Sequence, residues 1–219
     1  MIDYHPPKEP WLEILHKDRD IMVVNKPTGL LSVPGRGAEY EDSVLWRVQQ
    51  EGFPRAAAAH RLDMATSGVI VIPLNPNAHR ELSRQFRERE TDKHYLAWVW
   101  GEMSEECGQV DLPLCVDWPN RPKQKVDFTE GRHALTLWQK LKVDNGCTLV
   151  KLTPITGRSH QLRVHMLELG HPILGDNLYA HPQALAAAPH LYLHAARLAF
   201  THPRSGERVA FEAAPPFAL

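Results

Sequence analysis

Hydrophobic and polar residues follow one another in short runs that predict many strands and few helices. We expect two strands over residues 12–15 and 21–25, joined at Asp18-Arg19-Asp20, and further strands over 69–74 and 93–101. The run Val69-Ile70-Val71-Ile72-Pro73-Leu74 is apolar almost throughout, which is typical of a buried strand. These segments indicate that a sheet makes up much of the fold.

The second half of the chain continues the same pattern. Residues 134–143 and 147–153 predict a hairpin, because Asn145-Gly146 is a strong signal for a tight turn. A last hairpin is expected between 191–200 and 209–212, whereas residues 102–126 read as loop with one short strand near Val110.

Four helices are expected between these strands. The first is capped by Asp42 or Ser43 and ends at Gly52, and the second starts at Asn75-Pro76 and places Ala78, Leu82 and Phe86 inward. A third covers residues 158–169, and a short fourth covers 183–187. We predict an α+β fold with a mostly antiparallel mixed sheet flanked by helices, forming one domain over residues 1–219 with an irregular segment at 1–10.

Composition places the chain among ordinary globular proteins. It is 43% hydrophobic and 23% charged, and its net charge of −1 provides no overall attraction to nucleic acid. Its three cysteines form no C-x-x-C pair, which fits a reducing compartment. The N-terminus lacks the features of a signal peptide, and no apolar run is long enough to span a bilayer. We therefore expect a cytoplasmic protein with no membrane partner.

The segment from His60 to Gly68 is the strongest candidate for chemistry. Asp63 directly precedes the buried strand, with Arg61 two residues before it and Thr66-Ser67-Gly68 after it. Loops fixed by a rigid scaffold commonly carry catalytic groups. The alternative is a capped turn in which Asp63 accepts backbone N–H groups, because aspartate is common in turns for that reason.

Motifs for metals and cofactors are absent from the sequence. The 13 histidines include no H-E-x-x-H pattern, and His160 and His165 are five residues apart, which would place them on different helix faces. No Gly-rich signature for a dinucleotide or nucleoside triphosphate occurs either. We expect neither a metal nor a cofactor.

Positive charge is concentrated between Asn120 and Lys142, where six basic residues face two acidic ones. At the start of this region, over residues 118–125, Trp118 and two prolines are interleaved with Arg121, Lys123 and Lys125. Prolines would hold such a loop extended, and an extended basic loop can follow a phosphate backbone. An ordinary solvated loop would have a similar composition.

Four motifs in order resemble the pseudouridine synthases, specifically the family of the large-ribosomal-subunit uridine isomerases. They are His60-Arg61-Leu62-Asp63-x-x-Thr66-Ser67-Gly68, Lys93-x-Tyr95-x-Ala97-x-Val99-x-Gly101, the segment from Thr156 to His165, and Gly170-His171-Pro172-Ile173-x-Gly175-Asp176-x-x-Tyr179. The resemblance extends from Val23-Val24-Asn25-Lys26-Pro27 onward. Residues 111–114 and 118–126 resemble members of dual specificity, which modify one uridine in 23S rRNA and one in the anticodon loop of certain tRNAs. Two positions depart slightly from the family pattern: Ser159 and Leu162 occupy positions where Thr and Ile are also common in the family.

The resemblance implies roles for individual residues. Asp63 would be the catalytic carboxylate, Arg163 would pair with it and favour its ionised form, and Tyr95 would stack on the target base and help to move the C5 proton. The other residues expected to bind RNA are His60, Arg61, Arg121, Lys123, Lys125, Arg158 and His160.

The resemblance also implies the reaction and the partner. Uracil would leave C1′ of its ribose and rejoin through C5, so that atoms and redox state are conserved. The route through attack at C1′, attack on the ring or a glycal stays open. The target uridine must leave its stack, which costs least in a loop. We expect an RNA partner (23S rRNA and the tRNA anticodon stem-loop), a monomer, and no S4-like RNA-binding domain. A different uridine target, or a non-catalytic RNA-binding protein of the same fold, are the alternatives.

Overall fold

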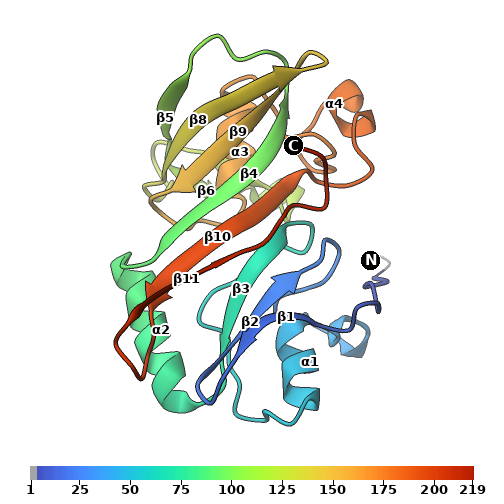
Figure 1. Ribbon diagram of the computed structural model, residues 1–219. Coiled ribbons are helices and arrows are strands. Elements are labelled where there is room, and N and C mark those ends of the chain that lie inside the picture. Colours follow the sequence, from blue (N-terminus) through green and yellow to red (C-terminus); the bar gives the residue numbers. More distant parts are fainter. Residues whose placement is uncertain (1–3) are drawn as a thin grey trace. The chain divides into compact units, whose positions relative to one another are not determined.

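The computed structural model describes residues 4–219 (Figure 1). The chain divides into two compact units, residues 1–93 with 195–216 and residues 94–194 with 217–219. Residues 4–10 contain no helix or strand, as predicted, and the first three residues of the predicted irregular segment lie outside the described part. That the whole chain acts as one domain stays a prediction.

The first unit is built on neighbouring strands of a β-sheet. Their order is β1 (Glu13–Lys17), β2 (Ile21–Lys26), β3 (Ser67–Pro73) and β10 (Leu193–Thr201), and β11 (Arg208–Glu212) pairs with β10. The predicted hairpins β1–β2 and β10–β11 are both present. β3 is buried along its whole length, which explains why its sequence is apolar rather than alternating.

Helices of the first unit begin where the sequence supplies caps. Helix α1 (Val44–Gln50) is capped by Ser43, whose side chain accepts a hydrogen bond from the N–H of Trp46. A single 3-10 turn, η1 (Ala38–Tyr40), precedes it. Helix α2 (Pro76–Glu88) starts at Asn75, as predicted, and Leu82 joins the sheet core. That core contains Ile21, Val23, Val69, Val71, Leu82, Leu198 and Phe200.

The second unit contains four antiparallel strands in the order β4 (Asp92–Trp100), β9 (Cys147–Pro154), β8 (Leu135–Asp144) and β5 (Cys107–Asp111). Strand β4 begins two residues before this unit. The predicted β8–β9 hairpin is confirmed, and both of its turn residues, Asn145 and Gly146, have positive φ. This is the backbone that an Asn-Gly turn requires.

Two predictions for this unit were wrong in detail. Residues 114–126 are not an extended loop, because β6 (Leu114–Val116) pairs with β7 (Gln124–Val126) around the 3-10 turn η2 (Trp118–Asn120). We call residues 114–126 the β6–β7 hairpin.

The third predicted helix starts later than expected, as α3 (Gln161–Glu168), because His160 adopts a left-handed φ of 54° that ends the preceding turn. Helix α4 (Pro182–Ala186) lies where a short helix was expected.

The α+β class is thus confirmed, with antiparallel pairing between all the strands for which a register is described. No helix within residues 4–219 is long and apolar enough to cross a bilayer.

Candidate active site

Asp63 lies on a turn that the preceding loop braces from several sides. The N–H of Thr66 donates to the carbonyl of Asp63 across 3.1 Å, which closes the turn itself. The hydroxyls of Thr28 and Ser32 donate to the carbonyls of Ala65 and Leu62, at 2.8 and 2.7 Å. These bonds fix the backbone on both sides of the half-buried Asp63 and so restrict where its carboxylate can be.

Lys26 is the centre of this support. Its side chain is fully buried, and its ammonium donates to the carbonyls of Pro27, Leu30 and Met64 at 3.0, 2.7 and 3.0 Å. Burial lowers the pKa of Lys26 to about 7, and the negative charge of Asp63 opposes this shift. The lysine therefore joins the two loops and places a cationic group in the electrostatic environment of Asp63.

The strand that follows is fixed by a close backbone contact. Gly68 has a φ of 116°, and a Cβ there would lie 2.3 Å from the carbonyl oxygen of Ala195. Only glycine allows β3 to begin this close to β10.

His60 and Arg61 precede Asp63 and have different surroundings. Nε2 of His60 accepts the N–H of Val71 at 3.1 Å, and its ring stacks on Phe86 at 4.2 Å. Burial, with the charge of Lys93, lowers the pKa of His60 to about 3, so the ring is neutral. His60 thus has a supporting contact that its sequence position did not reveal, whereas Arg61 is exposed.

Arg163 belongs to a buried ion pair in the second unit. Its Nε and Nη2 donate to Oδ2 and Oδ1 of Asp176 at 2.8 and 2.5 Å, and both side chains are almost completely buried. Asp176 also accepts the N–H groups of Leu178 and Tyr179. This geometry fixes the orientation of the guanidinium. The predicted pairing with Asp63 would join the two units, and it stays a prediction.

Tyr179 connects Arg163 to the β6–β7 hairpin. Its ring lies 5.1 Å from the Arg163 guanidinium, and its hydroxyl accepts the N–H of Gln124 at 2.8 Å. The same hydroxyl lies 2.6 Å from Nδ1 of His160. His160, predicted to bind substrate, is therefore held by Tyr179 at the start of α3. Tyr95 lies on β4, half-buried and opposite Leu152 of β9.

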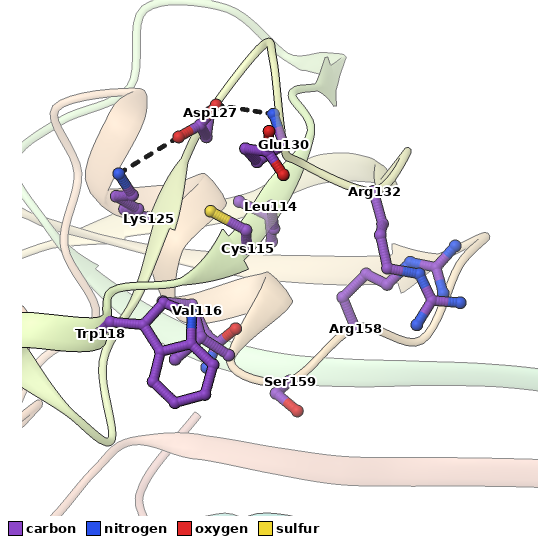
Figure 2. A pocket seen from close by; sticks show the side chains of 11 residues that line it. Leu114, Cys115, Val116, Trp118, Lys125, Asp127, Glu130, Arg132, Arg158 and Ser159 are labelled. Carbon is purple, nitrogen blue, oxygen red and sulfur yellow. Dashed lines mark hydrogen bonds and ion pairs between the residues drawn. The ribbon is translucent and has the colours of Figure 1, made fainter.

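Two of the basic residues predicted to bind RNA, Lys125 and Arg158, line a hollow of about 550 Å³ at the β6–β7 hairpin (Figure 2). Arg132, which was not among the predicted residues, lines it too. Nε of Arg158 donates to the carbonyl of His133 at 3.0 Å. Lys125 is paired with Asp127 at 3.2 Å.

Arg121 and Lys123 belong to the turn of the same hairpin. The Arg121 guanidinium lies 3.4 Å from the centre of the Trp118 ring, and the backbone of Lys123 closes the turn with Asp117 and Asn120. The prolines therefore shape a compact turn, and the expectation of an extended basic loop was wrong.

Comparison with known proteins agrees with these motifs. Residues 20–168 match the family model described as RNA pseudouridylate synthase. The chain is 59% identical over 219 residues to the dual-specificity RNA pseudouridine synthase RluA of Escherichia coli, with 99% of each chain covered, and 55% identical over 218 residues to that of Haemophilus influenzae, again with 99% of each covered. The structure of human RNA pseudouridylate synthase domain containing 1 aligns with a TM-score of 0.76 at 29% identity, covering 94% of this chain and 84% of that one. The chain belongs to the RNA pseudouridylate synthase family.

Membership in this family makes the chain an isomerase that acts on RNA. The family resemblance read from the sequence is thereby confirmed, and the α+β class agrees with the structural relative.

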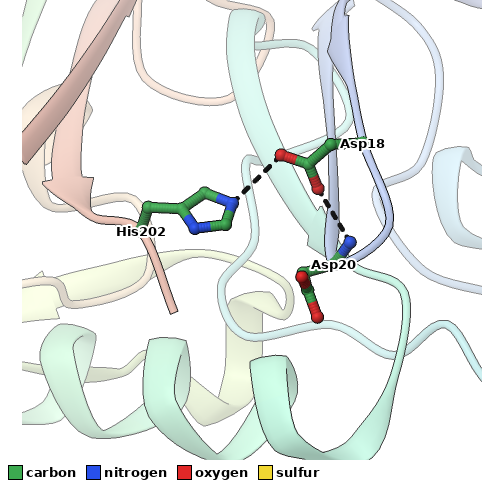
Figure 3. A group of neighbouring side chains, drawn as sticks. All are labelled: Asp18, Asp20 and His202. Atoms are coloured by element: carbon green, nitrogen blue, oxygen red, sulfur yellow. Dashed lines mark hydrogen bonds and ion pairs between the residues drawn. The ribbon is translucent and has the colours of Figure 1, made fainter. Parts of the chain in front are cut away.

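Among the described residues, one cluster has the composition of a metal site, formed by Asp18, Asp20 and His202 (Figure 3). Its oxygens are already engaged. Asp18 accepts two backbone N–H groups and contacts His16 and His202, while Asp20 pairs with Arg204 and accepts from Asn75. We call this cluster the Asp18 clasp; it ties the β1–β2 turn to the end of β10.

Two important residues were not singled out from the sequence. Lys26 was named only in the stretch from Val23 to Pro27 where the family resemblance begins, and Asp176 only as part of a motif. The available signal was the position of a lysine at the end of an otherwise apolar strand, because a buried lysine requires several acceptors.

Proposed function

We propose that this pseudouridine synthase isomerises a loop uridine in 23S rRNA and one in the anticodon stem-loop of tRNAs. The observation that carries the proposal is the fixed Asp63 turn, in a chain similar over 99% of its length to enzymes named dual-specificity RNA pseudouridine synthase. An alternative within the same chemistry is a different rRNA or tRNA uridine.

In the proposed mechanism Asp63 is the catalytic carboxylate. In its ionised form it either bonds to the substrate or stabilises positive charge that develops at C1′ as the glycosidic bond breaks. Breaking the bond between N1 and C1′ frees uracil to turn, and the new bond between C5 and C1′ forms before the C5 proton leaves. N1 carries a proton in the product, and any bond between Asp63 and the substrate is broken again by the end of the reaction. The bonds broken and formed balance without an oxidant, a reductant or a phosphate donor.

The other site residues assist this step. Arg163, whose guanidinium is oriented by Asp176, pairs with the Asp63 carboxylate. Tyr95 stacks on the uracil and helps to move the C5 proton. Arg61 and His60 adjoin the extruded nucleotide, and Arg121, Lys123, Lys125, Arg158 and His160 hold the RNA. The protein would work as a cytoplasmic monomer without a metal or cofactor.

The experiment compares Asp63→Asn with the parent on two RNA substrates, a 23S rRNA fragment and a tRNA anticodon stem-loop. Tritium release from C5-labelled uridine should fall to background for the variant, while filter binding of RNA should be retained, because the amide keeps the shape of the carboxylate but cannot act as an anion. Asp144→Asn, at the exposed β8–β9 turn, is the matched control and should have the parent's rate. If the variant's rate stays within about tenfold of the parent's, the substitution raises the activation free energy by no more than about 1.4 kcal/mol. Asp63 would then not be the catalytic carboxylate.

A further inference from the structure

The hollow at the β6–β7 hairpin contains groups that the reaction at Asp63 does not use. Trp118 lines it with 67% of its surface exposed, which is unusual for the largest apolar side chain. The Arg121 guanidinium covers a face of the indole at 3.4 Å and holds the ring in place. A fixed, exposed aromatic ring at the edge of a hollow is a surface on which a base can stack.

Positive charge is concentrated on another side of the same hollow. Arg132 and Arg158 come from separate segments and both line it (Figure 2). Within residues 4–219 no carboxylate lies within ion-pairing distance of Arg132. Two arginines that line one hollow supply N–H donors and positive charge that a phosphate can bind.

The acidic residues of the hollow are Asp127 and Glu130. Asp127 accepts the N–H groups of Thr129 and Glu130 and pairs with Lys125, and these bonds lower its pKa to about 2. Its charge is therefore largely satisfied by neighbours at the end of the hollow near Lys125 (Figure 2). Glu130 is exposed and is the remaining acidic side chain of the lining.

We propose that this hollow is a subsite for a second, unpaired nucleotide of the RNA, with its base stacked on Trp118 and its phosphate held by Arg132 and Arg158. This rests on the proposed function, since the nucleotide belongs to the loop that presents the target uridine. The volume of about 550 Å³ is within the range of roughly 300–1,000 Å³ that is common for small-ligand sites. The hydroxyl of Ser159, also in the lining, provides a donor for the sugar or the phosphate.

The test measures equilibrium binding of a tRNA anticodon stem-loop to the full chain carrying Asp63→Asn, so that no turnover occurs. Trp118→Ala should weaken binding by roughly 10- to 100-fold, which is the usual effect of losing one stacked base. Arg132→Gln should flatten the slope of log affinity against log salt by about 0.7, the value for one contact to a single strand.

The chain offers a matched control for each variant. Phe128→Ala removes an aromatic ring that is 79% exposed but does not line the hollow, and Lys142→Gln removes an exposed cation of the same basic region. Both should bind as the parent does. Thermal melting of all four variants establishes that they are folded, and a nucleotide substituted with 5-iodouridine beside the target should crosslink to the peptide containing Trp118.

The outcomes separate the subsite from the reaction. If Trp118→Ala and Arg132→Gln match their controls in affinity and salt slope, or if the crosslink maps elsewhere, the subsite is wrong even when the parent enzyme converts RNA normally. Weakening by both variants together with the Trp118 crosslink supports the subsite. Failure of the parent chain to release tritium from either RNA would instead overturn the proposed substrates.

Discussion

Single residues set the electrostatics of this enzyme, and Lys26 is the clearest case. Its ammonium is enclosed by three carbonyl oxygens, yet burial still lowers its pKa to about 7. An unfolded lysine keeps its proton to about pH 10.4. Between these values the unfolded chain binds more protons than the folded one, so the stability that depends on Lys26 rises with pH.

This dependence predicts how Lys26→Met changes the pH profile of unfolding. Urea denaturation at pH 7, 8 and 9 should show that the parent gains stability relative to the variant as pH rises, by on the order of 1 kcal/mol per pH unit. Lys17→Met removes an exposed lysine of the same unit and should follow the parent's pH profile. Parallel profiles for the parent and Lys26→Met would contradict the lowered pKa.

Asp176 illustrates a different effect at the same scale. It is 1% exposed and forms both bonds of a bidentate pair with Arg163. Replacing it with Asn would leave a buried guanidinium without its counter-charge, which typically costs about 3–5 kcal/mol. We expect Asp176→Asn to lower the melting temperature strongly and to reduce turnover more than RNA binding, because the orientation of Arg163 is lost.

The control for Asp176→Asn is Glu212→Gln, the same chemical change in an exposed pair with Arg197. Exposed pairs contribute roughly 0–1 kcal/mol, so its melting temperature should change little. Equal effects of the two substitutions would mean that the Arg163–Asp176 pair has no special part in the fold.

At the scale of elements, the sequence predicts what local signals determine. The cap at Asn75 and the Asn145-Gly146 turn were correctly placed, and Ser43 is one of the two caps expected for α1, because each of these features depends on a few adjacent residues. The β6–β7 hairpin was missed because strands of three residues have too little periodicity to detect. The positions of Lys26 and Asp176 depend on partners in other segments, and local patterns contain no information about them.

The observed hairpin alters the expectation for the basic residues within it. Lys125 is paired with Asp127, and Lys123 is half-buried in the turn, so neither is an isolated charge on an extended strand. We still expect both to contact RNA phosphates. Replacing Lys123 and Lys125 with Ala should weaken rRNA and tRNA binding alike and flatten the salt slope by about 0.7 for each lost contact to a single strand.

Turnover at saturating RNA should barely change in this double variant, since neither lysine is proposed to touch the uracil. Single-turnover tritium release measures that rate, and filter binding over a series of salt concentrations measures the slope. A salt slope equal to the parent's would show that the two lysines are only solvated. RNA binding would then depend on Arg121, Arg132 and Arg158.

At the scale of the whole molecule, the nearly neutral net charge conceals a strong segregation of charge. The chain carries 25 basic and 26 acidic residues, so its RNA affinity must come from local groups and not from a general field. Some acidic residues elsewhere are paired internally, as at α2 and just after its end, where Arg84 contacts Glu81, Glu88 and Glu90. The Asp18 clasp is another such internal pairing, and it permits a test of whether any metal contributes to the fold or the reaction.

We expect exhaustive dialysis against a chelator to change neither the melting temperature nor the rate of tritium release. Hydrogen bonds from His16, from the backbone and from His202 outweigh burial and lower the pKa of Asp18 to about 2, so the carboxylate is ionised and already satisfied at neutral pH. A metal ion at the clasp would have to displace Arg204 from Asp20 as well. Isomerisation of uridine also conserves atoms and redox state, so the reaction itself does not require a metal.

Asp20→Asn should lower the melting temperature by the same amount with and without chelator, because it breaks the ion pair with Arg204. A loss of activity on dialysis that zinc restores in the parent but not in Asp20→Asn would instead identify the clasp as a metal site.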